Sequence, residues 1–211
     1  MKRVSLLLAL LVTIGLRPIV GSADNTLNSV LQRIRIQQGQ HFSYHQTRHL
    51  QLLSEPWNAS GEMYLSPKTM LISQKTPVET STIISANHLI HINPEQNVHR
   101  KLTLDRPYAV PGMEPFMQLL YIPSGHEQLM NDYFITLKNE QRRWLIVMKP
   151  KKQLDTKIVE LRLSGIQAEG PDNLHVLNKD GDRTEWQLTL LAKGSSAEID
   201  LQKTLDLLST H

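Results

Sequence analysis

Cysteine is absent from the 211-residue sequence, and its absence limits both the architecture and the chemistry of the protein. Without cysteine there are no disulfide bonds, no thiolate metal ligands and no thiol nucleophile. A chain anchored by lipid needs an acylated cysteine near its start, so we expect a protein that carries no lipid anchor of its own. Its stability must then come from a hydrophobic core.

Long apolar runs are also missing beyond the first 23 residues. Lys2 and Arg3 precede an apolar stretch from Val4 to Leu16, Pro18 interrupts it, and Ala23 ends a group of small residues. This pattern predicts a signal peptide over residues 1–23, cleaved near Ala23, and an exported mature chain. The apolar stretch is too short to cross a bilayer about 30 Å thick. Residues 24–211 are long enough to bury a core as one domain.

An excess of charge of one sign is missing as well. The formal net charge of +3 comes from Lys2, Arg3 and Arg17, because residues 1–23 contain no acid. The rest of the chain therefore balances 20 basic residues with 20 acidic ones. A protein that binds nucleic acid through its phosphates needs an excess of cations. The sequence thus argues against a nucleic-acid partner.

Catalytic and cofactor motifs are not found. There is no nucleophile elbow, phosphate-binding loop or His-Glu-x-x-His pattern, so we predict neither an enzyme nor a cofactor. His41, His45 and His49 suggest a metal site, but on a strand successive members lie about 13 Å apart. A zinc ion needs its nitrogen ligands about 2 Å away. We therefore predict no metal and expect these histidines on a solvated face.

What the sequence does contain is a series of short alternating segments separated by Pro, Gly or Asn. An amphipathic helix comes first, with Leu27, Val30, Leu31 and Ile34 at helical spacing, capped by Asp24 or Asn25 and ending near Gly39. Strands are then predicted at 41–50, 60–66, 69–75, 81–87, 88–92, 97–105, 133–139, 142–149, 156–164, 173–178 and 184–191. The fold class is therefore mainly β with some α, as a strongly curved antiparallel sheet or incomplete barrel.

Two helices are predicted between the sixth and seventh strands. Residues 111–121 have apolar side chains at helical spacing, and Ser124 and Glu127 have capping-box spacing for a second helix that ends near Tyr133. Residues 180–183 read Asp-Gly-Asp-Arg, which is typical of a hairpin turn. The stretch 195–208 is compatible with an edge strand and tail or with a short helix.

Several segments together resemble one family. Residues 42–48 have the form Phe-x-x-x-Gln-x-Arg, residues 144–150 end a strand as Trp-Leu-Ile-Val-Met-Lys-Pro, and residues 180–184 form the late hairpin. In this order and spacing they resemble the periplasmic outer-membrane lipoprotein carriers, the LolA-like proteins. The resemblance implies an incomplete antiparallel barrel covered by lid helices. It also implies a periplasmic monomer that receives lipidated protein from an inner-membrane exporter and passes it to an outer-membrane acceptor.

The sequence departs from this family at two positions. The typical carriers have an arginine before the proline ahead of the third strand, where it helps to latch the lid, and here that residue is Ser66. A tryptophan common in the next strand is replaced by Ile72. Arg48 is the substitute latch that the sequence offers, bonding lid carbonyls or a lipid ester. The alternative is that the strand ends there and the guanidinium reaches solvent.

The resemblance implies an apolar cavity for acyl chains, and methionine suits such a surface because its side chain adapts to variable shapes. The predicted ligand-binding residues are Phe42, Tyr44, Arg48, Met63, Leu65, Met70, Ile72, Met113, Phe116, Met117, Leu120, Met130, Trp144, Ile146 and Met148. Each of the apolar ones is equally compatible with ordinary core packing. Two other functions stay open: a carrier of a different lipid or polyene-type product, and an envelope sensor of the same fold that transports nothing.

Overall fold

A computed structural model describes residues 26–110, 113–122, 125–140, 142–151, 154, 156–167 and 170–208. The predicted signal peptide and the predicted Ser124 cap lie outside these ranges. The strands are β1 (Gln40–His49), β2 (Trp57–Leu65), β3 (Thr69–Thr76), β4 (Thr80–Ser85), β5 (His88–Asn93), β6 (Val98–Thr103), β7 (Tyr133–Glu140), β8 (Arg143–Pro150), β9 (Ile158–Ile166), β10 (Gly170–Asn178) and β11 (Arg183–Lys193). The helices are α1 (Leu27–Ile34), α2 (Glu114–Tyr121), α3 (Gly125–Asp132) and α4 (Ser195–Leu208).

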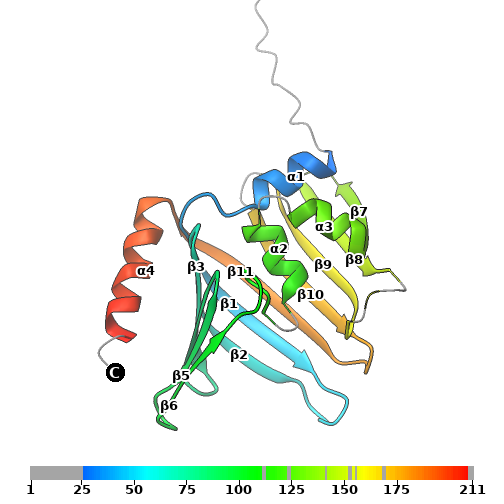
Figure 1. The fold of residues 1–211 in the computed structure, drawn as a ribbon. Helices are drawn as coiled ribbons and strands as arrows, with labels where there is room; N and C mark the ends of the chain where they lie inside the picture. The colour runs from blue at the N-terminus through cyan, green and yellow to red at the C-terminus, as the bar shows by residue number, and fades with distance from the viewer. Residues whose placement is uncertain are drawn as a thin grey trace, which may run out of the picture.

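All eleven strands form one antiparallel sheet in the order β6-β5-β4-β3-β2-β1-β11-β10-β9-β8-β7. The sheet curves strongly without closing, and α1, α2 and α3 gather on its concave side, whereas α4 stands beside β3 (Figure 1). The predicted fold class is therefore confirmed. The predicted hairpin at residues 180–183 is also confirmed, because it joins β10 to β11 and Gly181 takes the positive φ of 86° that the turn requires.

The concave face is apolar because the strands alternate. On β8, Trp144, Ile146 and Met148 are buried, while the residues between them are half-buried and Arg143 and Lys149 at its ends are exposed. Successive side chains on a strand point to opposite faces, so this pattern sends every second residue to the interior. The same alternation places Phe42 and Tyr44 of β1 in the interior.

Helix α1 begins and ends elsewhere than predicted. Its N-cap is Thr26, whose side-chain oxygen accepts a hydrogen bond from the Ser29 amide, so the predicted caps Asp24 and Asn25 were wrong. The helix ends at Ile34 rather than near Gly39. Beyond it the backbone is extended, and the Ile36 amide donates to the carbonyl of Leu120 in α2 at 3.0 Å. This tertiary hydrogen bond replaces the next turn of helix.

Helices α2 and α3, together called the lid below, match the two predicted central helices. Pro115 occupies the first turn of α2, where its missing amide hydrogen costs no helical hydrogen bond. The buried side of α2 includes Phe116, Met117, Leu119 and Leu120, and α3 buries Leu129. The lid thus turns an apolar surface towards the sheet.

The C-terminal stretch is helical, which decides between the two predicted alternatives. Gly194, with a φ of 76°, turns the chain out of β11 into α4. Helix α4 then packs on the convex face, where Leu201 contacts a small cluster that contains Tyr64 and Leu71. None of the helices in the described ranges is long and apolar enough to cross a membrane.

The convex face also holds a buried carboxylate. Glu160 on β9 is 7% exposed, with Lys149 Nζ 3.1 Å from Oε2 and Arg162 Nε 2.5 Å from Oε1. Burial raises the pKa of Glu160, but the hydrogen bonds and charges of these two cations outweigh it and leave the pKa below its usual value. The carboxylate therefore remains ionised and ties β8 to β9.

Candidate functional site: an apolar interior under the lid

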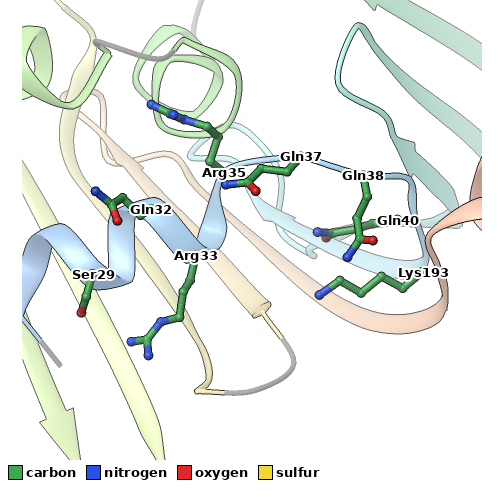
Figure 2. Close-up of a pocket in the computed structure, with 8 residues that line it drawn as sticks. All are labelled: Ser29, Gln32, Arg33, Arg35, Gln37, Gln38, Gln40 and Lys193. Carbon is green, nitrogen blue, oxygen red and sulfur yellow. The ribbon is translucent and has the colours of Figure 1, made fainter. Parts of the chain in front are cut away.

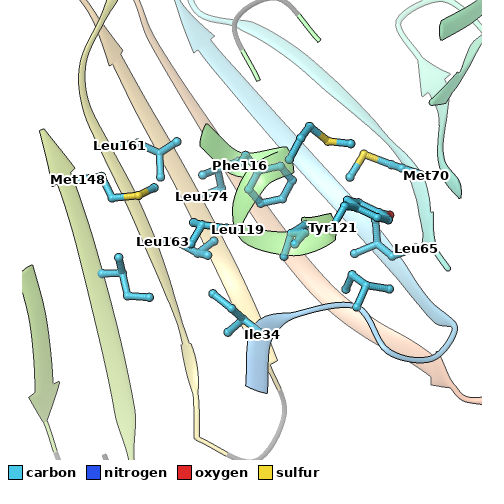
Figure 3. Close-up of a cluster of buried hydrophobic side chains, with 14 of the residues drawn as sticks. Ile34, Leu65, Met70, Phe116, Leu119, Tyr121, Met148, Leu161, Leu163 and Leu174 are labelled. Atoms are coloured by element: carbon cyan, nitrogen blue, oxygen red, sulfur yellow. The ribbon is translucent and has the colours of Figure 1, made fainter. Parts of the chain in front are cut away.

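The candidate site is the space between the concave face of the sheet and the lid. Its side chains form one continuous apolar cluster that takes members from α1, α2, α3 and both halves of the sheet. Met70, Met117 and Met148 in this cluster are completely shielded from solvent. Figure 3 shows Phe116, Leu119 and Tyr121 of α2 placed between Met148 on one side and Met70 on the other. The lid therefore fills the interior with its own side chains.

Thirteen of the fifteen predicted ligand-binding residues meet in or against this cluster. The buried ones are Phe42, Tyr44, Met63, Leu65, Met70, Phe116, Met117, Leu120, Trp144, Ile146 and Met148, and the partly buried ones are Ile72 and Met113. Arg48 and Met130 are exposed, and Met130 on α3 leaves 40% of its surface in solvent. That these residues bind ligand stays a prediction.

Other residues of the interior were not among the predicted ligand-binding residues. They include Ile34, Ile84, Val110, Leu129, Tyr133, Leu161, Leu163 and Leu174. The sequence contains a signal for some of them, because Leu161, Leu163 and Gly165 alternate with the polar residues Glu160, Arg162 and Ser164. Leucine provides much of the same apolar surface as methionine in this interior.

Two tyrosines bond to the turn between β2 and β3: Tyr121 at the end of α2, and Tyr108 in the segment between β6 and α2. The Tyr121 hydroxyl donates to the Thr69 carbonyl at 3.4 Å, and the Tyr108 hydroxyl donates to the Lys68 carbonyl at 3.2 Å. The two rings stack with centroids 4.7 Å apart. Burial raises the pKa of Tyr121 well above its usual value, so its hydroxyl stays protonated and able to donate.

A family model described as outer membrane lipoprotein carrier protein LolA matches residues 37–201. The chain belongs to the LolA family. The match spans all eleven strands and the lid, so the resemblance predicted from short segments is confirmed. Helix α1 precedes the matched residues. No curated protein shows significant similarity to the sequence.

Solved structures similar to this LolA-family chain include a LolA superfamily protein from Nitrosomonas europaea, with 9% identity and a TM-score of 0.40, covering 78% of this chain and 91% of that one. An uncharacterised conserved protein from Thermus thermophilus has 11% identity and a TM-score of 0.46, covering 78% and 88%. A chain in the structure of the CwlD amidase from Clostridioides difficile in complex with the GerS lipoprotein has 12% identity and a TM-score of 0.36, covering 67% and 78%.

Ser66, one of the two departures from the LolA-like pattern, closes the turn between β2 and β3. Its amide donates to the Thr69 carbonyl at 2.8 Å, and its hydroxyl oxygen accepts from the Thr69 amide at 3.1 Å. The turn shaped in this way presents the two carbonyls to which Tyr108 and Tyr121 donate. The resemblance implied an arginine at position 66 that latches the lid. In this LolA-family chain the contacts between the turn and the lid side of the molecule come from the two tyrosines instead.

Arg48 lies at the far end of β1. Its guanidinium carbon is 4.7 Å from the centre of the Trp57 ring, a cation–π geometry. Desolvation lowers the pKa of Arg48, while the nearby Tyr44 works in the opposite direction. The side chain is nevertheless exposed. This placement agrees with the alternative in which the strand ends and the guanidinium reaches solvent.

The prediction that the histidines of β1 lie on a solvated face is wrong for His41. His41 is 9% exposed, with Nε2 3.3 Å from a Glu62 carboxylate oxygen and Nδ1 3.4 Å from one of Asp200 in α4. Its ring stacks on Tyr64 with centroids 4.1 Å apart. The imidazole therefore joins α4 to the sheet. Among the described residues there is no group of three or more side chains able to hold a metal ion.

Proposed function

We propose that the protein is a non-enzymatic carrier that binds acyl chains non-covalently in its apolar interior. Its cargo is a lipidated polypeptide, received in the periplasm from an inner-membrane exporter and delivered to an outer-membrane acceptor. Membership of the LolA family supports the carrier role. The observation that carries the proposal is the apolar concave face, which is covered by helices that are not part of the sheet.

The energetics of such an interior suit a ligand that must be released. Burying a palmitoyl chain of about 14 methylenes is worth on the order of 11 kcal/mol. Admitting it requires displacement of Phe116, Met117 and Leu120, and exposing each of these costs roughly 2 kcal/mol. The lid side chains therefore compete with the acyl chain for the same surface. This competition offsets about half of the gain and makes release to a partner feasible.

Trp144 provides a direct test, because it lies in the interior and is 3% exposed. A brominated palmitate that enters the interior should quench Trp144 fluorescence at contact. Trp186 is packed against the same cluster and its ring lies against that of Tyr44, so both variants are made in a Trp186→Phe background, in which we expect Trp144→Phe to lose most of the quenching. Trp57→Phe, which alters a half-buried ring beside Arg48, is the matched control and should keep it. Equal quenching in the Trp186→Phe background with and without Trp144→Phe would place the acyl chain elsewhere.

Native mass spectrometry of protein purified from its own cell envelope identifies the cargo. A bound triacylated polypeptide supports lipoprotein transport, and a bound free lipid supports a carrier of a different lipid. Protein that is empty and also fails to bind brominated palmitate would overturn both and leave a non-transporting sensor of the same fold.

A further inference from the structure

A polar groove lies against the end of the apolar interior, between α1 and the start of β1. It has a volume of about 530 Å³. We call it the Gln40 groove, and it is lined by Ser29, Gln32, Arg33, Arg35, Gln37, Gln38, Gln40 and Lys193. Figure 2 shows these side chains spread from α1 to the paired ends of β1 and β11. The groove is therefore elongated and follows the segment that joins α1 to the sheet.

The same segment separates the groove from the interior. Helix α1 buries Val30, Leu31 and Ile34, and its exposed positions Gln32 and Arg33 line the groove. In the linker after it, Ile36 belongs to the apolar cluster while its neighbours line the groove. A ligand with an apolar part in the interior can thus place an adjoining polar part in the groove without crossing the sheet.

Gln40 connects the two spaces. Two positions before Phe42 on β1, it leaves the strand on the interior side, and Lys193 is its direct partner on β11. The Gln40 side chain is 7% exposed, and its Oε1 atom accepts no hydrogen bond from the described residues. A buried acceptor without a partner is uncommon and costs stability. It therefore points to a ligand that brings a hydrogen-bond donor.

The chemistry of the groove matches an extended peptide. Four of its lining residues are glutamines, whose amides both donate and accept hydrogen bonds as a peptide backbone does. The remaining charged residues are Arg33, Arg35 and Lys193, and no acidic residue is among the lining residues. Figure 2 shows Arg33 and Arg35 pointing to opposite sides of the linker, with Lys193 at the other end. The three cations without an acidic residue favour a ligand that is negatively charged.

We propose that the Gln40 groove binds the extended, acidic peptide segment that follows the acylated residue of a lipidated polypeptide. The proposal rests on the proposed carrier function, because the acyl chains occupy the interior while the peptide leaves through the groove. The groove distinguishes lipidated polypeptides by the charge of this segment. Gln40 accepts a hydrogen bond from its backbone.

The test uses synthetic lipopeptides with three palmitoyl chains on an N-terminal cysteine, followed by an acidic, a neutral or a basic hexapeptide. Binding is measured with the full mature chain by displacement of brominated palmitate. In about 20 mM salt we expect the acidic lipopeptide to bind at least about tenfold more tightly than the basic one. In about 500 mM salt the difference should largely disappear, because exposed charges are then screened within a few ångströms.

Two exposed cations of the groove can be neutralised with a matched control. Arg33→Gln with Lys193→Gln should reduce the preference for the acidic lipopeptide at least about threefold. Arg100→Gln with Lys101→Gln removes two exposed charges from the edge strand β6 and should leave the preference unchanged. Neither pair should alter the affinity for brominated palmitate.

The variant Gln40→Leu distinguishes a role of Gln40 in peptide binding from a role in stability. We expect it to weaken all three lipopeptides several-fold, with unchanged affinity for brominated palmitate and a melting temperature that is equal or higher. A purely structural Gln40 would instead lower the melting temperature and weaken palmitate binding as well, which would overturn its assigned role.

Equal affinity for the acidic and basic lipopeptides, with brominated palmitate still bound, overturns the groove proposal and leaves the carrier function intact. Failure to bind brominated palmitate overturns the carrier function and this proposal with it. The protein could also bind phosphatidylglycerol and phosphatidylethanolamine with different affinities but all three lipopeptides with the same affinity. That result would assign the groove to a lipid headgroup and refute the peptide proposal.

Discussion

The hydroxyls of Tyr108 and Tyr121 hold α2 and the segment before it to the turn between β2 and β3. Removing both hydroxyls should make lipid binding tighter and the protein less stable. The variant is Tyr108→Phe combined with Tyr121→Phe, which keeps both rings and their stacking. Their hydrogen bonds, at 3.2 and 3.4 Å, are long. A neutral hydrogen bond contributes about 0.5–1.5 kcal/mol, and we assign roughly 0.7 kcal/mol to each of these.

Together the two bonds favour the closed lid by about 1.4 kcal/mol, which is a factor of about ten. When only the open form admits lipid, the apparent dissociation constant falls as the population of that form rises. We therefore expect the affinity for brominated palmitate to rise about tenfold and its association to become faster. The melting temperature should fall by several degrees. Amide hydrogens of α2 should exchange faster.

The matched control is Tyr64→Phe, which also removes one hydroxyl hydrogen bond but lies on the convex face, where the hydroxyl donates to Glu62. It should lower stability and leave lipid affinity unchanged. If the double variant loses stability yet binds brominated palmitate with unchanged affinity and rate, the tyrosine contacts are structural and the reasoning about a closed lid is refuted.

The remaining predictions concern the sheet and α4. The pKa of Glu160 is lowered in the folded protein, so its contribution to stability is present above about pH 4.5 and is lost as the pH falls through the lowered pKa. In urea titrations at different pH values, Glu160→Gln should therefore lose less free energy of unfolding on acidification than the unaltered protein. Gly165→Ala would put a Cβ 2.0 Å from the Gly170 carbonyl oxygen and should cost more than about 3 kcal/mol, so a small loss would contradict the close approach of β9 and β10. Leu201→Ala should cost about 2 kcal/mol without affecting lipid affinity, whereas Leu207→Ala, at a position 68% exposed, should cost almost nothing.

Local patterning predicted most of the sheet. Trp144, Ile146 and Met148 alternate so regularly that their strand, its buried face and its approximate ends follow from the residues alone. The register between β1 and β11 did not follow, because hydrophobic periodicity within a strand contains no information about which distant strand pairs with it.

The misplaced features depend on contacts between distant segments. Helix α1 has no local reason to end at Ile34, since the hydrogen bond from Ile36 to Leu120 appears only in the folded chain. His41 looks solvated on its strand until α4 brings Asp200 to it. Arg48 shares the alternation of Phe42, yet it lies at the end of β1, where the side chain reaches solvent. Sequence patterns describe the face of a strand better than they describe its ends.

The central position of β1 and β11 has a consequence for how the chain acquires its structure. Gln40 and its partner Lys193 are 153 positions apart, so the middle of the sheet forms only after a long loop has closed. Until β11 is in place, β1 and β10 are open edges whose backbone groups can pair with other chains. Such distant pairing slows folding. The last strand of this sheet to be synthesised is therefore the one that joins its two halves, and its late arrival leaves a period in which aggregation competes with folding.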